Sequence, residues 1–296
     1  MEKVTTQKLT NIPETMLITV WARAVETQTK NPIIIDQKAV ECVEKIDYDF
    51  SKFKKSKLSQ VGCSIRAKLI DDEAKKFIAE NPDCVVIQLG TGLDARFDRF
   101  GRPNVTHWYD LDLPQSIETR EKLLPATDQN SYLPISLFDY SWIDMVLSNK
   151  KPILIIVEGV LMYFSPDEVR EFFEKIVEKI PKATILMDLL PVVLVGKAKS
   201  HDSLKKVKNA EFKWGIKKAQ EIEDWNPRIH VTKEYFLSDF DQKKFPMMFR
   251  FLYKIPYFYR KFNQRVVQLD IFKKSPEGDF YAAASSRCFG CTTGGR

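Results

Sequence analysis

Short apolar runs, each followed by polar or turn-forming residues, are the clearest feature of the hydrophobic pattern from position 84 onward. Such runs indicate strands that are buried on both faces, as in a parallel sheet. The predicted strands are Cys84–Leu89, Thr106–Leu111, Tyr132–Leu137, Ile153–Val157, Thr184–Leu189, Arg228–Phe236 and Arg265–Phe272.

Helical periodicity fills the chain before and between these strands. Three helices are predicted ahead of the first strand: Thr15–Thr29, Gln37–Ile46 and Ser59–Ala79. A later helix begins with Ser165 as N-cap and Pro166 in its first position, and the Lys-rich residues 196–224 are also predicted to be helical. Alternation of strand and helix indicates an α/β fold with helices on both faces of the sheet, here with an N-terminal helical cap.

The segment 245–262 holds eight aromatic residues and is predicted to be ordinary core. A wall of a substrate pocket and a membrane-facing surface are the alternatives. We find no internal repeat or low-complexity linker, so a single domain is expected. It would consist of a helical cap (1–80), a core (81–275) with a helical insertion at about 191–262, and a flexible tail (276–296).

Composition narrows the class of protein. The 296 residues are 44% hydrophobic and 29% charged, as in an ordinary globular protein, and no apolar run is long enough to cross a bilayer. The N-terminus lacks the apolar stretch of a secretory signal and the five cysteines form no disulfide framework, so a cytoplasmic location is expected. The net charge of +6 includes clusters at 52–55 and 205–208, which we interpret as solvated surface rather than as nucleic-acid or membrane contacts. No metal site is expected, since Cys288 and Cys291 make only half of a zinc-binding spacing.

A glycine pair after the first strand is the best candidate for ligand chemistry. Gly90 and Gly92 allow a tight strand-to-helix turn and let a ligand approach the backbone. With Ala95, the Gly-x-Gly-x-x-Ala spacing permits a dinucleotide as well as any other adenosine cofactor. Asp110 and Asp112 follow roughly 20 residues later, where a ribose-binding carboxylate is expected.

Ligands of such folds bind beyond the carboxyl ends of the strands, and Gly90, Asp112, Asp139 and Glu158 are all predicted there. A buried carboxylate is costly unless it is paired, which favours a functional role for Glu158. Asp110 is interpreted as a structural or capping residue.

Several separated motifs together resemble the leucine carboxyl methyltransferase family. The resemblance is greatest to its bacterial branch, which includes carboxyl O-methyltransferases of polyketide biosynthesis. The motifs are Ala22–Thr27, Ile65–Asp71, Leu89–Arg96, Asp110–Pro114 and Val157–Phe164. The resemblance implies a Rossmann-like class I S-adenosylmethionine-dependent methyltransferase, with seven mostly parallel strands and one antiparallel strand near the edge.

The resemblance also implies roles for individual residues. Arg66 would hold the methionine carboxylate of the cofactor with Arg23 nearby, although Arg66 could instead pair with Asp71 or Asp72 of its own helix. The remaining cofactor-binding candidates are Gly90 and Gly92 through their backbone, Asp112 at the ribose, Glu158 at the methionine end, and Ser136, Leu137 and Asp139 near the adenine. Ser136 stands where relatives often have an aspartate, and Asp139 is the alternative adenine contact.

The predicted function is therefore O-methylation, with S-adenosyl-L-methionine as cofactor and a carboxylate of a small polyketide-like or aromatic metabolite as acceptor. A carboxylate is ionised at pH 7 and needs no general base, and none of the three histidines lies in a motif. Glu158 and Tyr163 are the candidate catalytic residues, and a hydroxyl acceptor would direct the search for a base to them. A nicotinamide-dependent oxidoreductase and a non-catalytic cofactor-fold module are the alternatives, and the oligomeric state stays open.

Overall fold

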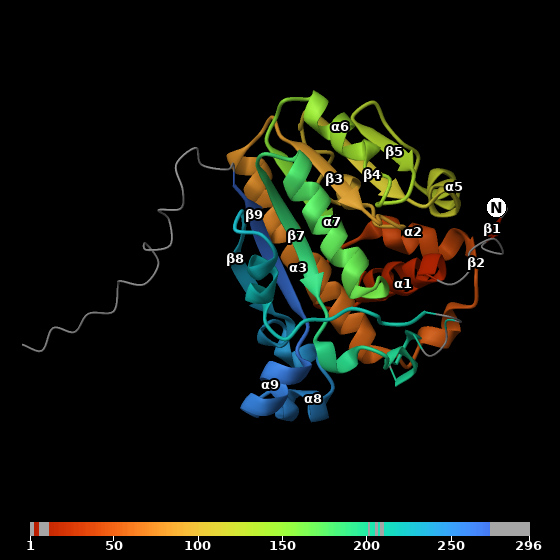
Figure 1. The fold of residues 1–296 in the computed structure, drawn as a ribbon. Coiled ribbons are helices and arrows are strands. Elements are labelled where there is room, and N and C mark those ends of the chain that lie inside the picture. The colour runs from red at the N-terminus through yellow and green to blue at the C-terminus, as the bar shows by residue number, and fades with distance from the viewer. Residues whose placement is uncertain (1–2, 6–11, 201, 205–206, 208–209, 273–296) are drawn as a thin grey trace, which may run out of the picture.

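The computed structural model describes residues 3–5, 12–200, 202–204, 207 and 210–272 (Figure 1). Its main sheet has seven strands in the order β5-β4-β3-β6-β7-β9-β8. Their bounds are β3 Val85–Leu89, β4 His107–Asp112, β5 Asn130–Pro134, β6 Ile153–Val157, β7 Ala183–Leu189, β8 Ile229–Phe236 and β9 Arg265–Ile271. Among these seven strands, β9 alone runs opposite to the other six. The predicted mostly parallel seven-stranded sheet is confirmed, although β5 begins and ends earlier than expected.

Helices α6 (Ser141–Ser148) and α7 (Pro166–Lys179) cover one face of this sheet. Because side chains alternate along a strand, Ile153, Ile155 and Val157 point into this layer, where they pack with Trp142 and Phe172. Helix α7 begins as predicted.

Ser165 and Glu168 form a reciprocal capping box at the start of α7, with Pro166 in the first helical turn. Two exposed backbone donors are thereby satisfied, which fixes where the helix starts.

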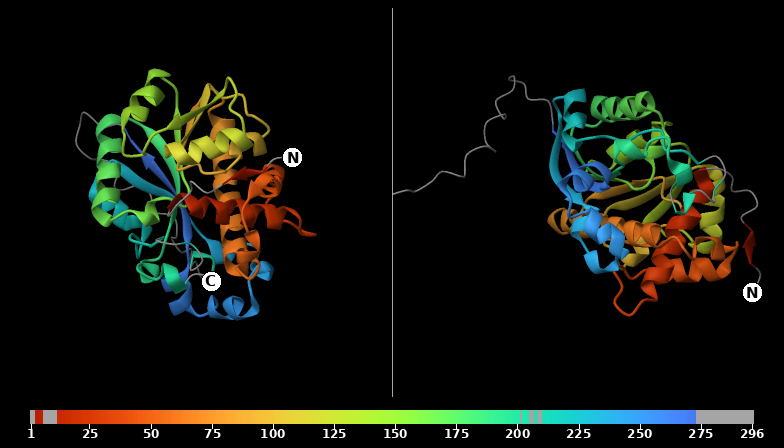
Figure 2. Two further views of the ribbon diagram at one scale, coloured as in Figure 1. Left: turned by 90° about the vertical axis from the view of Figure 1, so that its right-hand side faces the viewer. Right: turned by 90° about the horizontal axis from the view of Figure 1, so that it is seen from below.

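Helix α3 (Lys57–Glu80) covers the opposite face. Its Ile65, Leu69 and Ile70 pack against Val86 of β3 and Ile156 of β6. Figure 2 shows the sheet enclosed between helices in both of its views. The third predicted N-terminal helix is thus a layer of the main core.

Helices α1 (Met16–Thr27), α2 (Gln37–Lys45), α4 (Arg96–Arg99) and α5 (Pro114–Leu123) gather beside the carboxyl ends of the strands (Figure 1). Met16, Leu17 and Val20 of α1 pack with Ala39 of α2 and Leu93 of the loop after β3. A short parallel pair, β1 (Val4–Thr5) and β2 (Ile46–Asp47), lies alongside. None of the helices within the described ranges has the length and apolar character of a membrane span.

The prediction of a helix over residues 196–224 is wrong for the part of it that is described. The described part of this segment contains no α-helix, and its longest helical elements are the 3-10 helices Ala198–Ser200 and Ala219–Trp225. Phe212 is buried in one hydrophobic cluster and Trp214 and Ile216 in another, so tertiary contacts hold the backbone extended in spite of the helix-favouring lysines.

The aromatic stretch forms two short helices, α8 (Met247–Leu252) and α9 (Pro256–Phe262). Phe245 is buried, and Phe249 and Tyr253 pack against the core. The prediction of ordinary core therefore holds only for the side of the stretch that faces the sheet and its helices. Large apolar side chains on the other side are exposed: Met247, Met248, Phe251, Ile255 and Tyr257. The predicted flexible tail (276–296), including Cys288 and Cys291, lies outside the described residues.

Candidate active site

A cavity of about 220 Å³ opens at the carboxyl ends of β3, β4 and β6, beneath α1. It is lined by all but one of the predicted site residues: Arg23, Arg66, Gly90, Gly92, Asp112, Ser136, Leu137, Glu158 and Tyr163. Residues separated by more than a hundred positions in sequence thus meet around one space, although their individual roles stay predictions. Helix α1 also contributes Met16, Ile18 and Thr19, which the sequence had not singled out.

Asp139 is the predicted residue that the structure leaves out of the cavity lining. Its exposed carboxylate accepts a hydrogen bond from the backbone N–H of Ser141 at the start of α6, and its pKa is lowered by the Ser141 hydroxyl and by this backbone bond. Ser136 and Leu137 do line the cavity. No residue of the aromatic stretch 245–262 lines it, so the pocket-wall interpretation finds no support at this cavity; Phe245, Tyr253 and Tyr259 instead line a separate, smaller cavity.

The turn after β3 depends on its glycines. Gly90 and Gly92 have positive φ angles of 66° and 51°. A Cβ atom on Gly90 would lie 2.3 Å from Cγ2 of Val160, and one on Gly92 would lie 2.9 Å from Cβ of Met16. Any side chain would therefore be both strained and obstructed at Gly90, which keeps the backbone accessible from the cavity.

The two aspartates of β4 have different environments. Asp112 lines the cavity, and its carboxylate accepts hydrogen bonds from the N–H groups of Gly92 and Leu113, both at 2.7 Å. Burial raises the pKa of Asp112 although these bonds act against the rise. Its position ties the carboxylate directly to the glycine turn.

Asp110 is instead surrounded by four protein donors. They are the Thr91 hydroxyl, the Trp108 indole, the Arg120 guanidinium and the Asn130 amide, at 2.7 to 3.1 Å. This pattern agrees with the interpretation of Asp110 as structural.

Arg66 enters the cavity from α3 between two carboxylates. Its Nε donates to Glu158 at 3.0 Å and its Nη1 to Asp188 at 3.1 Å. The alternative pairing of Arg66 with Asp71 or Asp72 on its own helix is wrong, because Asp71 pairs with other arginines and Asp72 with Lys68. Burial would lower the pKa of Arg66, but the charges of Asp188 and Glu158 raise it above its ordinary value.

Gly159 makes room for this arrangement. Its φ is 71°, and a Cβ atom there would lie 2.8 Å from Nη2 of Arg66. Its N–H donates to Asp188 at 2.6 Å.

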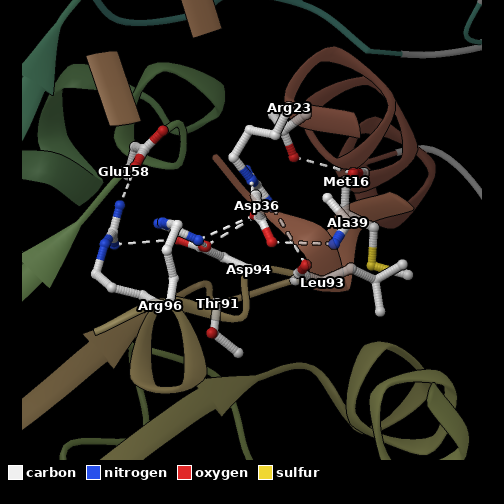
Figure 3. A network of polar contacts seen from close by, with 12 residues as sticks. Met16, Arg23, Asp36, Ala39, Thr91, Leu93, Asp94, Arg96 and Glu158 are labelled. Carbon is white, nitrogen blue, oxygen red and sulfur yellow. Dashed lines mark hydrogen bonds and ion pairs between the residues drawn. The ribbon is translucent and has the colours of Figure 1, made fainter. Parts of the chain in front are cut away.

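These groups belong to a larger set that we call the arginine–carboxylate network: Arg23, Arg66, Arg96, Arg99, Asp36, Asp71, Asp94, Glu158 and Asp188. Figure 3 shows Arg96 bridging Glu158 and Asp94, with Arg23 on Asp36 beyond. Burial would raise the pKa of Asp94, but Arg96, Arg99 and Arg23 hold it well below its usual range. The network contains four guanidinium groups and five carboxylates, so it carries one excess negative charge when all are ionised.

Sequence reasoning missed several members of the network. Asp188 had a usable signal, because it stands at the carboxyl end of a buried strand as Glu158 does. Asp36 gave a weaker signal as the N-cap of α2, where it accepts from the N–H of Ala39. Gln88 is also buried at the cavity, and its Oε1 has no hydrogen-bond partner among the described residues.

The remaining titratable groups of the cavity are Tyr163 and Cys63. Burial raises the pKa of Tyr163 to about 12, although a hydrogen bond with Thr15 acts against the rise. Burial likewise raises the pKa of the Cys63 thiol. No histidine is among the described residues that line the cavity. Near pH 7 both groups are therefore neutral.

Two comparisons of sequence bear on this site. The leucine carboxyl methyltransferase family model matches residues 16–177. The tetracenomycin polyketide synthesis O-methyltransferase TcmP of Streptomyces glaucescens is 31% identical over 235 residues, which cover 79% of this chain and 86% of that protein. An S-adenosyl-L-methionine-dependent methyltransferase of Gibberella zeae, dpfgK, is 28% identical over 57% of this chain and 61% of its own.

Solved structures resemble the fold at low sequence identity. A putative methyltransferase from Thermobifida fusca superposes with a TM-score of 0.55 at 12% identity, over 91% of this chain and 97% of that one. A DUF574 family protein from Streptomyces avermitilis gives a TM-score of 0.53 at 10% identity, over 86% and 96%. These likenesses support the α/β architecture described above.

Proposed function

Because this chain belongs to the leucine carboxyl methyltransferase family and is an S-adenosylmethionine-dependent methyltransferase, we propose that its methyl acceptor is a carboxylate on a small aromatic or polyketide-like metabolite. We place this reaction in the cytoplasm and on small molecules rather than nucleic acid. The family assignment does not support the two alternatives, a nicotinamide-dependent oxidoreductase and a non-catalytic module.

The cavity suits the cofactor by its donors, acceptors and charge. Arg66 would hold the methionine carboxylate, Gln88 Oε1 offers an acceptor for the ammonium group, and Asp112 would take the ribose hydroxyls. S-adenosylmethionine supplies a methyl group on a positively charged sulfur and carries one net positive charge. The single excess negative charge of the arginine–carboxylate network complements it.

The observation that carries the carboxylate proposal is that the described lining residues offer no free base. They include no histidine, and the carboxylates among them, Asp94, Asp112 and Glu158, already accept from protein donors. The Tyr163 phenol, whose pKa burial raises to about 12, keeps its proton at pH 7 and acts as a hydrogen-bond donor rather than as a base. A donor suits an acceptor that is already an anion, because it can orient the carboxylate oxygen toward the methyl group. Glu158 is held by Arg66 and Arg96, which favours a role in the network over proton abstraction.

Matched acceptors test the proposal. Aromatic acids and the corresponding phenols would be incubated with labelled S-adenosylmethionine, and the labelled product treated with mild alkali. We expect a product that releases methanol, as a methyl ester does, and a methyl-transfer step that is nearly independent of pH between about 6 and 9, since the acceptor ionises below about pH 5. A base-stable methyl ether, formed at a rate that rises with pH, would overturn the proposal.

Tyr163→Phe separates orientation from base catalysis. It should lower kcat/KM by about 10-fold, the loss expected for one hydrogen bond, and leave the pH profile flat. Loss of a pH-dependent limb in this variant would instead identify Tyr163 as a base.

A further inference from the structure

Helices α8 and α9 carry an apolar surface that the fold does not use. Phe245, Phe249 and Tyr253 face the core, and the Phe245 and Tyr253 rings lie 5.9 Å apart. The opposite side presents Met247 at 68% exposure and Phe251 at 62%. The exposed apolar set, which also contains Met248, Ile255 and Tyr257, is called the α8–α9 patch.

The α8–α9 patch lies in a segment of one charge sign. Residues 242–262 contain six lysines and arginines and no acidic residue: Lys243, Lys244, Arg250, Lys254, Arg260 and Lys261. Lys244 pairs with Glu26, whereas the other five form no ion pair within the described ranges and are exposed. Lysines on other helices have a carboxylate partner three or four residues away. Lys68 pairs with Asp72 in α3, and Lys175 pairs with Glu178 in α7.

The cations are interleaved with the apolar side chains. Arg250 precedes Phe251 and Lys254 precedes Ile255, with the Lys254 ammonium 5.7 Å from the Phe251 ring. The Lys261 ammonium lies 4.8 Å from the Tyr257 ring. Apolar groups flanked by long cationic side chains match the boundary of a bilayer, where the rings enter the acyl region and the cations reach the headgroups.

We propose that the α8–α9 patch docks this enzyme on the surface of an anionic lipid membrane. Charge complementarity selects this occupant over a second copy of the chain. A two-fold contact through the patch would bring the same cations together from both subunits, and the nearest carboxylates in sequence, Asp239 and Asp241, are too few to compensate the six cations of the segment. An anionic leaflet supplies the missing negative charge and accepts the apolar side chains.

The patch lies away from helix α1, which borders the candidate active-site cavity, so a membrane docked on the patch would leave that cavity accessible. Helices α8 and α9 connect the carboxyl end of β8 to β9, and they protrude at the lower edge of the molecule in Figure 1, away from α1 and α2. Helix α9 contacts the turn Val192–Leu194, which follows β7, and Val192 is itself exposed.

Vesicle flotation with the full chain tests the proposal. Vesicles of phosphatidylcholine alone would be compared with vesicles that contain about 30% phosphatidylglycerol. We expect binding to the anionic vesicles that weakens as NaCl rises from about 0.05 to 0.5 M. Arg250→Gln/Lys254→Gln should weaken it by roughly 25-fold, since each cation near an anionic leaflet contributes about five-fold. Phe251→Ser/Ile255→Ser should weaken it by at least about 10-fold through lost apolar burial.

The matched control is Met145→Ser/Lys182→Gln, which removes one exposed apolar residue and one exposed cation away from the patch, and it should bind as the unaltered chain does. Calorimetric binding of S-adenosylhomocysteine by every variant would establish that each is folded. Equal binding of the control and patch variants, or none to anionic vesicles at low salt, would overturn the proposal. So would a concentration-dependent dimer that the patch substitutions abolish, because it would assign the patch to a second copy.

Discussion

At the scale of single residues, Asp110 and Asp112 of β4 allow a matched pair of test substitutions. Asp112→Asn should leave the protein folded and weaken S-adenosylhomocysteine binding by 10-fold or more, because a charged hydrogen bond contributes about 1.5–3 kcal/mol. Asp110→Asn should instead lower the free energy of unfolding by about 3–5 kcal/mol, since Arg120 would lose its buried partner. Calorimetry and urea unfolding on both variants measure the two effects.

The opposite result would reverse the assignment. If Asp110→Asn lost affinity while Asp112→Asn kept it, the ribose carboxylate would be Asp110. Strand periodicity alone could not choose between them, because alternate residues of a strand share a face, and the assignment of Asp112 to the ribose came from the family resemblance. The choice depends on Trp108, Arg120 and Asn130, whose side chains reach Asp110 only in the folded structure.

The same limit applies to the arginine–carboxylate network. Glu158 could be recognised because it follows an apolar strand and lies in a family motif. Asp36 and Asp71 lie on early helices, and nothing in their local sequence indicates that Arg99 will bridge them. Long-range ion pairs of this kind are set by tertiary structure and have no short sequence signature.

At the scale of elements, local pattern predicted the strands well and the segment after β7 badly. Ile153–Val157 was predicted with its observed bounds, because five consecutive buried apolar residues form an unambiguous run. Residues 196–224 favour helix by composition. In the folded chain, however, Gly215 lies against the backbone that follows β7, and a Cβ atom on Gly215 would lie 2.9 Å from the Leu190 carbonyl oxygen. Such a backbone contact cannot be inferred from composition.

Glycine placement gives a prediction at this scale. Gly90→Ala should disrupt the turn between β3 and α4, because the new Cβ would lie 2.3 Å from Val160 and the residue would keep φ near 66°. We expect a loss of several kcal/mol in unfolding free energy, about 3 or more, together with loss of cofactor binding. Gly62→Ala, within α3 and with no atom near the new Cβ, should stabilise the protein by about 0.5–1 kcal/mol.

Urea unfolding and S-adenosylhomocysteine titration would measure both variants. A Gly90→Ala protein as stable as the unaltered chain and still able to bind would show that the turn tolerates a side chain. Gly62→Ala controls for the general effect of replacing glycine.

At the scale of the whole molecule, the arginine–carboxylate network connects segments that are distant in sequence. Arg23 lies on α1, Asp71 on α3, Arg99 on α4 and Glu158 after β6. Its members are nearly all buried, so removing one partner would leave an uncompensated charge rather than a hydrated one. The cavity is therefore lined in part by the same ion pairs that join the N-terminal helices to the sheet.

Lowering the pH should destabilise the arginine–carboxylate network by protonating Asp94. Its carboxyl titrates near pH 4 in the unfolded chain but well below that in the folded protein, because Arg96, Arg99 and Arg23 favour the ionised form. Since the unfolded state then binds more protons, the stability due to Asp94 is complete above about pH 5 and is lost as the pH falls below about 4. Asp94→Asn should consequently cost about 3–5 kcal/mol at pH 7, and this difference from the unaltered protein should shrink in acid.

Urea unfolding of both proteins at a series of pH values measures that difference. Taking the difference also cancels the opposite contributions of Asp112 and Asp188, whose pKa values are raised by burial and whose protonation in acid favours the folded state. Asp98→Asn, four residues later and within α4, is the control, because the one ion pair of Asp98 among the described residues is with the largely exposed Arg102 and its removal should cost at most about 1 kcal/mol. If the cost of Asp94→Asn were as small as that of Asp98→Asn at pH 7, the network would not connect these elements energetically, and the cavity would have to be held by apolar packing alone.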